Sequence, residues 1–116
     1  MKTLRITFEM EIDVQFEDPE AAKAYFVDGD WKKDFYELND LEALAVAVAS
    51  GFHHETDRWD TDLKCWCRFV EGFGKFVMIK DTPCAFRLTD GYAKEGGGHI
   101  LVRYESELDD AGTYEV

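Results

Sequence analysis

The strongest constraint on the fold is the alternation of apolar and polar residues over residues 4–16, LRITFEMEIDVQF. Every even position in this stretch is apolar, and every odd position is polar or charged. A two-residue period is typical of a β-strand with one face on a hydrophobic core and the other in water. Because strands usually have about five or six residues, we expect this one to be bent, bulged or longer than its neighbours.

Two helical segments are predicted before residue 40. Asp18 followed by Pro19 is typical of a helix N-terminus, because aspartate accepts hydrogen bonds from the first turn and proline fits the first helical position. This helix is expected to end near Val27, where Asp-Gly-Asp favours a turn. The stretch 31–38 is expected to add one or two helical turns. Its packed residues would be Trp31, Phe35 and Leu38.

A longer helix is predicted over 40–52. Asn39 followed by Glu42 matches a capping pattern at its start. The segment LEALAVAVASGF is apolar on nearly all sides, so we expect this helix to be buried and packed across a sheet.

The segment 62–71 fits two structures. Leu63, Trp66, Cys67 and Val70 recur at helical spacing, and a glycine follows as a stop signal, which favours a third helix. The alternative is a strand, because Cys65, Cys67 and Phe69 also alternate with Trp66, Arg68 and Val70.

The last third of the chain predicts antiparallel strands, because short apolar runs are separated by a proline turn at 81–83 and a glycine-rich loop at 90–98. The expected strands are 75–80, 84–89 and 99–107, and residues 108–116 would add a short edge piece.

Together these elements predict an α+β fold in one domain over 1–116, with the order β-α-α-α-β-β-β. The first strand would pair with the later ones, giving a mainly antiparallel sheet of about four strands in a two-layer structure. Two or three helices would pack on one face. The acidic odd positions of the first strand would lie on the open side of the sheet or at its edge.

The net charge of the chain restricts the classes of molecule that it is expected to bind. Among 116 residues, 13 are basic and 25 acidic, which gives a net charge of −12. This charge disfavours direct binding to nucleic acid or anionic membranes and favours a basic protein surface as partner. The longest apolar run is far shorter than the roughly 20 residues of a membrane span. With three cysteines and no signal-like N-terminus, a cytoplasmic location is expected.

One group of residues has the chemistry of a metal site. His53 and His54, with Cys65 and Cys67 downstream, are ligand types that zinc prefers, but their spacing differs from that of known structural zinc sites. The simpler interpretation is that the histidines lie near the negative end of a helix and that the cysteines are buried packing residues. No nucleophile motif or phosphate-binding motif is present, so we expect no enzyme, no metal and no cofactor.

The remaining feature is an acidic surface. Glu9, Glu11 and Asp13 would project from one side of the first strand at about 6.6–7 Å spacing, close to the phosphate separation of a nucleic acid strand. Further acids expected beside them are Glu17, Asp18, Asp28, Asp30, Asp34, Glu37 and Asp40, with a second cluster at Glu105, Glu107, Asp109 and Asp110. The alternative is a solvated surface that keeps the protein soluble.

A short, very acidic, aromatic-rich chain without a catalytic motif resembles small phage-encoded or prophage-encoded proteins, among them anti-CRISPR inhibitors and phage domain families of unknown function. The resemblance is one of type and matches no motif. It implies a protein that occupies a basic surface on a host DNA-handling or RNA-handling complex.

The function expected from the sequence is therefore that of a non-enzymatic binding or inhibitor protein with an acidic face. Two alternatives stay open. One is a metal-binding domain or hydrolase that uses His53, His54, Cys65 and Cys67. The other is a homo-oligomeric structural module, for example a homodimer through the long first strand.

Overall fold

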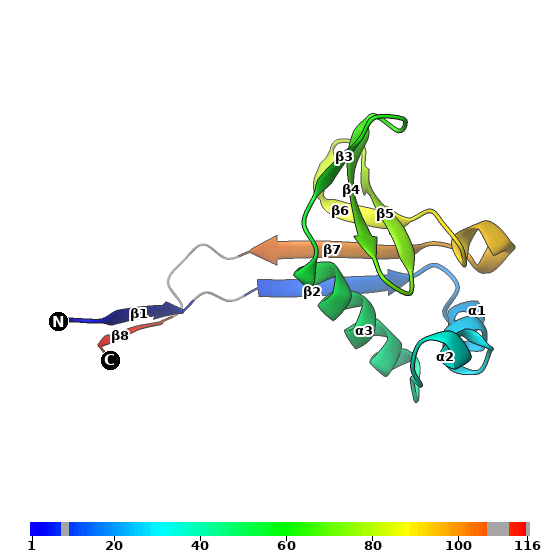
Figure 1. The fold of residues 1–116 in the computed structure, drawn as a ribbon, viewed down its shortest axis with the longest axis horizontal. Coiled ribbons are helices and arrows are strands. Elements are labelled where there is room, and N and C mark those ends of the chain that lie inside the picture. Colours follow the sequence, from blue (N-terminus) through cyan, green and yellow to red (C-terminus); the bar gives the residue numbers. More distant parts are fainter. Residues whose placement is uncertain (8–9, 107–111, 116) are drawn as a thin grey trace.

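The main feature of the computed structural model, which describes residues 1–7, 10–106 and 112–115, is a six-stranded antiparallel sheet in the order β2-β7-β6-β5-β4-β3 (Figure 1). Its strands are β2 (Met10–Phe16), β3 (Arg58–Asp60), β4 (Cys65–Val70), β5 (Gly74–Ile79), β6 (Thr82–Leu88) and β7 (Ile100–Ser106). A separate two-stranded ribbon pairs β1 (Leu4–Thr7) with β8 (Gly112–Glu115). The predicted α+β class is confirmed.

The predicted strand over 4–16 is divided between the two sheets. β2 pairs with β7 from Met10 to Phe16, whereas β1 belongs to the ribbon, which lies beyond the end of the main sheet (Figure 1). Over β2 the alternation is confirmed. Even positions 12, 14 and 16 are half-buried against the core, and odd positions 11, 13 and 15 are exposed.

The helices follow the predicted ranges closely. The predicted helix 19–27 is confirmed as α1 (Pro19–Ala22) continued by the π-helical segment η1 (Lys23–Val27). The Asp18 carboxylate accepts a hydrogen bond from the N–H of Ala21 at 3.0 Å, as a helix cap does. A short α2 (Trp31–Asp34) follows, and α3 covers Leu41–His54. The capping residue of α3 is Asp40, whose carboxylate accepts from the Ala43 N–H at 2.7 Å, and not Asn39.

Helix α3 lies across one face of the sheet and buries Leu44, Val48 and Phe52. The expected packing across the sheet is confirmed, but the helix is not buried as a whole. Val46 is 59% exposed, because a single layer of helix leaves the flank away from the sheet in water. We call the sheet face opposite α3 the open face.

The prediction of a helix over 62–71 is also wrong, because the segment contains β4. The carboxylate of Asp60 accepts hydrogen bonds from the N–H groups of Asp62 and Leu63 at 3.0 and 2.9 Å. Lys64 adopts a positive φ of 54°, so the chain reverses tightly from β3 into β4. β3 and β4 extend the sheet from the predicted four strands to six.

The three C-terminal strands of the prediction are confirmed as β5, β6 and β7. Residues 112–115 form the short strand β8, which pairs with β1 in the separate ribbon and adds no edge piece to the main sheet. The turn between β5 and β6 lies at residues 80–81, because Thr82 already begins β6. The glycine-rich loop contains a short π-type turn, η2 (Ala93–Gly97), in which Gly96 takes a positive φ of 87°.

An aromatic cluster fixes the short helices to the sheet. The Phe26 ring lies 5.6, 5.4 and 5.0 Å from the rings of Trp31, Phe73 and Tyr92, measured between centroids. The indole N–H of Trp31 also donates to the Gly72 carbonyl at 2.7 Å. Residues 17–42, which we call the helical end, are therefore held against the β4–β5 turn.

Candidate functional site

The acidic row predicted on the first strand is only partly within the described residues. Glu9 lies outside them. Glu11 and Asp13 are exposed on β2 and point to the open face. The register places Arg103 of β7 directly opposite Asp13, although no ion pair is formed between them.

The open face is not uniformly acidic. Cross-strand neighbours share a face of a sheet, so Arg103, Arg87 and Lys75 follow one another on β7, β6 and β5 beside the β2 carboxylates. Acidic side chains occupy the β2 margin, basic ones occupy the middle, and Asp60 on β3 lies at the opposite margin. This arrangement differs from the continuous negative ribbon that the sequence predicted.

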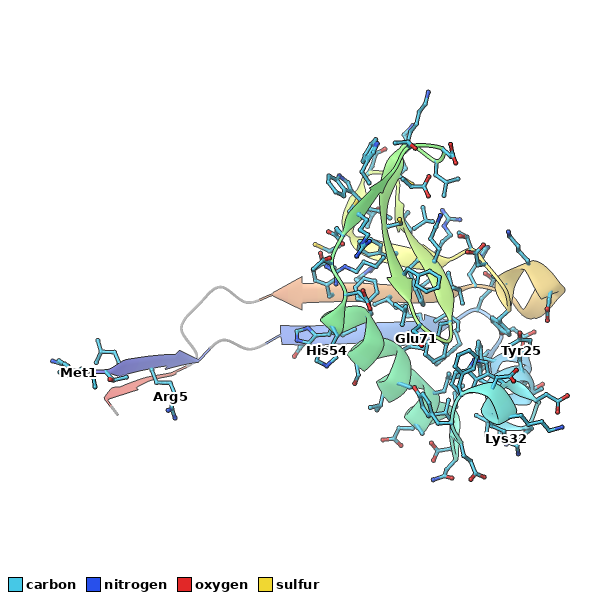
Figure 2. All side chains as sticks on the ribbon, viewed as in Figure 1. Met1, Arg5, Tyr25, Lys32, His54 and Glu71 are labelled. Carbon is cyan, nitrogen blue, oxygen red and sulfur yellow. The ribbon has the colours of Figure 1, made fainter. Side chains whose placement is uncertain are left out.

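The helical end is the most acidic part of the described chain. Its acidic residues are all exposed: Glu17, Asp18, Glu20, Asp28, Asp30, Asp34, Glu37, Asp40 and Glu42. The same segment contains three lysines, Lys23, Lys32 and Lys33, and no arginine, so it carries half of the net charge of −12. Figure 2 shows Lys32 pointing outward from this end.

Some of these carboxylates have local partners. Asp18 and Asp40 cap helices, Glu17 accepts from the His99 N–H at 3.4 Å, and Asp30 pairs with Lys33 at 3.1 Å on the surface. Surface pairs of this kind contribute little to stability and exchange readily with water or a partner. No ion pair within the described residues involves the other predicted acids of this end, Asp28, Asp34 and Glu37.

Two aromatic rings lie exposed among these acids. Phe35 is 47% and Tyr36 52% exposed, although the sequence predicted that Phe35 would be packed. Phe35 stacks on the outer side of the buried Trp31 at 4.9 Å, which fixes its position while leaving one face in solvent. A hollow of about 410 Å³ lies beside it, lined by residues that include Gly29, Asp30 and Asp34.

The predicted metal-ligand set is not assembled. His53 and His54 are exposed in the last turn of α3, whereas Cys65 and Cys67 point from β4 to the open face, on the other side of the sheet. Within the described ranges, no group of three or more histidine, cysteine, aspartate or glutamate side chains is placed to hold a metal ion. Burial raises the pKa of the Cys67 thiol, as expected of a packing residue.

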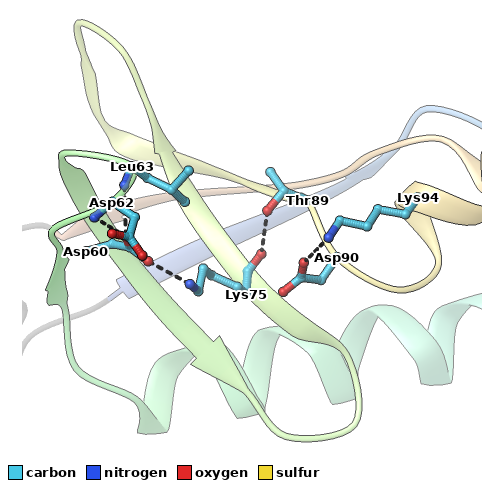
Figure 3. A pocket seen from close by; sticks show the side chains of 7 residues that line it. All are labelled: Asp60, Asp62, Leu63, Lys75, Thr89, Asp90 and Lys94. Atoms are coloured by element: carbon cyan, nitrogen blue, oxygen red, sulfur yellow. Dashed lines mark hydrogen bonds and ion pairs between the residues drawn. The ribbon is translucent and has the colours of Figure 1, made fainter.

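A pocket that sequence reasoning missed lies on the open face (Figure 3). It has a volume of about 370 Å³ and is lined by Asp60, Asp62, Leu63, Lys75, Thr89, Asp90 and Lys94. Lys75 contacts Asp60 at 2.6 Å, and Lys94 contacts Asp90 at 3.2 Å. The hydrogen bond between Lys75 and Asp60 lowers the pKa of Asp60 and raises the pKa of Lys75. Neither side chain therefore exchanges a proton near neutral pH.

The β3–β4 hairpin exposes a second aromatic pair. Trp59 and Trp66 lie opposite each other in register, with ring centroids 5.5 Å apart, and are 53% and 45% exposed. Lys64, Lys80 and Asp81 line the adjoining hollow, so this surface lacks the acidic excess of the helical end.

Comparison with family models, curated proteins and solved structures gives no match to this chain. Within the described ranges, no helix combines the length and apolar composition needed to cross a membrane.

Proposed function

We propose that this protein is a non-enzymatic binding or inhibitor protein of the cytoplasm that engages a basic surface on a partner. The observation that supports the proposal is the helical end, where exposed carboxylates surround the exposed rings of Phe35 and Tyr36. Aromatic side chains that are fixed before binding serve as interface anchors, and the surrounding charge selects the partner.

The expected binding behaviour follows from the charge. Carboxylates concentrated on one end accelerate association with a basic partner and make the affinity fall as salt increases. The resemblance to small acidic phage-encoded proteins, anti-CRISPR inhibitors among them, suggests that the partner is a nucleic-acid-handling complex whose basic groove this chain occupies.

Affinity capture tests the proposal. The purified protein is immobilised, exposed to a bacterial lysate, and eluted in steps from about 50 mM to about 1 M salt, a range over which screening becomes strong. We expect a basic nucleic-acid-handling protein that is released by salt. An empty eluate from a folded bait would count against the proposal.

A pair of matched variants locates the surface. Asp34→Lys with Glu37→Lys reverses the charges that flank the exposed rings. Glu55→Lys with Asp62→Lys makes the same change in net charge at exposed positions outside the helical end. We expect the first variant to lose the captured protein and the second to keep it. Equal loss in both would mean that only the overall charge matters.

A further inference from the structure

Strand β2 forms one margin of the six-stranded sheet and pairs only with β7. The N–H of Glu17 donates to the carbonyl of His99 directly opposite it at 3.0 Å. In an antiparallel pair, backbone groups point alternately toward the partner strand and away from it. Odd residues of β2 therefore bond to β7, while the backbone N–H and C=O groups of Ile12, Val14 and Phe16 point outward.

These outward groups form an open edge. Among the described residues, none donates to or accepts from the outward backbone groups of β2. The opposite margin, β3, has only three residues, which is a common way to protect an edge. β2 is more than twice as long, and over Met10–Phe16 it contains no proline, no lysine and no break in register.

The edge is also held rigidly. Ile12, Val14 and Phe16 pack against the buried core beneath α3, so the strand does not have to become ordered when another strand joins it. An added strand would place alternate side chains beside these apolar residues and the others beside Glu11 and Asp13 on the open face.

The charges of Glu11 and Asp13 determine which kind of strand can pair with the open edge of β2. A second copy of β2, paired antiparallel through this edge, would bring the carboxylates of the two chains opposite each other, which is unfavourable. A strand with lysine or arginine on the same face would instead form opposite-charge pairs with Glu11 and Asp13. Arg103 lies one strand further in, so a carboxylate is the nearest charge that such a strand would meet.

We propose that β2 is a docking strand: it accepts an extended basic segment of the partner as a seventh strand of the sheet. The segment has basic residues at alternate positions and apolar residues between them. The inference rests on the proposed function in one respect, the basic character of the partner, and it adds backbone pairing at a defined edge.

The test uses a synthetic peptide of about seven alternating lysine and valine residues, a length that matches β2. Binding to the protein is measured by calorimetry, with a glutamate and valine peptide as the charge control. Two further lysine and valine peptides carry N-methyl groups on all valines or on all lysines. In a paired strand, the backbone N–H groups of either the valines or the lysines point toward β2, and those of the other set point away. We therefore expect one methylated peptide to bind at least about tenfold more weakly and the other to bind normally.

Two protein variants complete the test. Val14→Pro removes an outward N–H without removing a bond to β7, and we expect it to lose the peptide. Asp13→Lys should weaken binding of the lysine peptide and strengthen binding of the glutamate peptide. If Val14→Pro fails to fold, the methylated peptides alone still decide the question.

The outcomes separate this inference from the proposed function. Equal binding of both methylated peptides, or no binding of the unmodified one, overturns strand addition while leaving salt-sensitive capture by the helical end intact. A dimer in solution that Val14→Pro dissociates would also overturn it, because a second copy would then occupy the edge. The Asp34→Lys and Glu37→Lys variant should bind the peptide normally.

Discussion

Arg68 on β4 links the end of α3 to the sheet, and its replacement is the most informative stability test. Its Nε donates to an oxygen of Asp57 at 2.6 Å and its Nη1 to the carbonyl of Phe52 at 3.0 Å. The guanidinium carbon lies 4.4 Å from the centre of the Phe52 ring and 5.4 Å from that of Tyr104. The side chain is only 14% exposed.

Arg68→Met keeps a long apolar side chain but removes both charged hydrogen bonds. Each such bond contributes about 1.5–3 kcal/mol, and a partly desolvated cation on an aromatic ring adds about 1 kcal/mol. Because Asp57 is 33% exposed and can recover water, we expect a loss of about 2–4 kcal/mol in the free energy of unfolding. The melting temperature should fall by roughly 10 °C.

Urea unfolding, followed by tryptophan fluorescence and circular dichroism, measures this loss. Arg87→Met is the matched control, because Arg87 is exposed on the open face and should change stability by less than about 0.5 kcal/mol. Equal stabilities of the two variants would refute the reasoning, since the contacts of Arg68 would then contribute nothing measurable.

Three further predictions concern single sites. The hydrogen bond from Lys75 lowers the pKa of Asp60 in the folded protein. The stability that the Asp60 carboxylate contributes is therefore present above its unfolded pKa and is lost as the pH falls below about 4. Over this pH range, the urea midpoint of Asp60→Asn should decline less than the urea midpoint of the wild type. Buried Cys67, with its raised thiol pKa, should react with a thiol reagent more slowly than exposed Cys84, as followed by mass spectrometry. Gly51→Ala should lower the melting temperature despite a helix-propensity gain of about 1 kcal/mol, because the new Cβ would lie 2.7 Å from the stiff side chain of Val70.

The parts of the fold that the sequence predicted correctly depend on local patterns. Alternation over 10–16 determines which side chains of β2 reach the core, and this holds whichever strand lies beside it. The cap at Asp18 with Pro19 likewise acts within one turn of helix.

The prediction of a helix over 62–71 was wrong because the apolar residues of this segment fit both the helical period and the two-residue period of a strand. Two features outside this pattern favour the strand: the turn that Asp60 stabilises and the pairing of β4 with β5. A window over 62–71 contains neither, since Asp60 precedes the segment and β5 begins only after it ends.

The candidate site illustrates the same division. Exposure of Glu11 and Asp13 follows from the alternation of β2, so the sequence predicted it. The charge of the surrounding surface depends on register, which brings Arg103 beside Asp13 from a strand far along the chain. The sequence therefore predicted a negative ribbon, whereas the described part of the open face carries basic residues between its acids. The acidic residues of the helical end lie within one continuous segment, so their proximity does not depend on strand register. The helical end is therefore the stronger support for the proposed recognition of a basic partner.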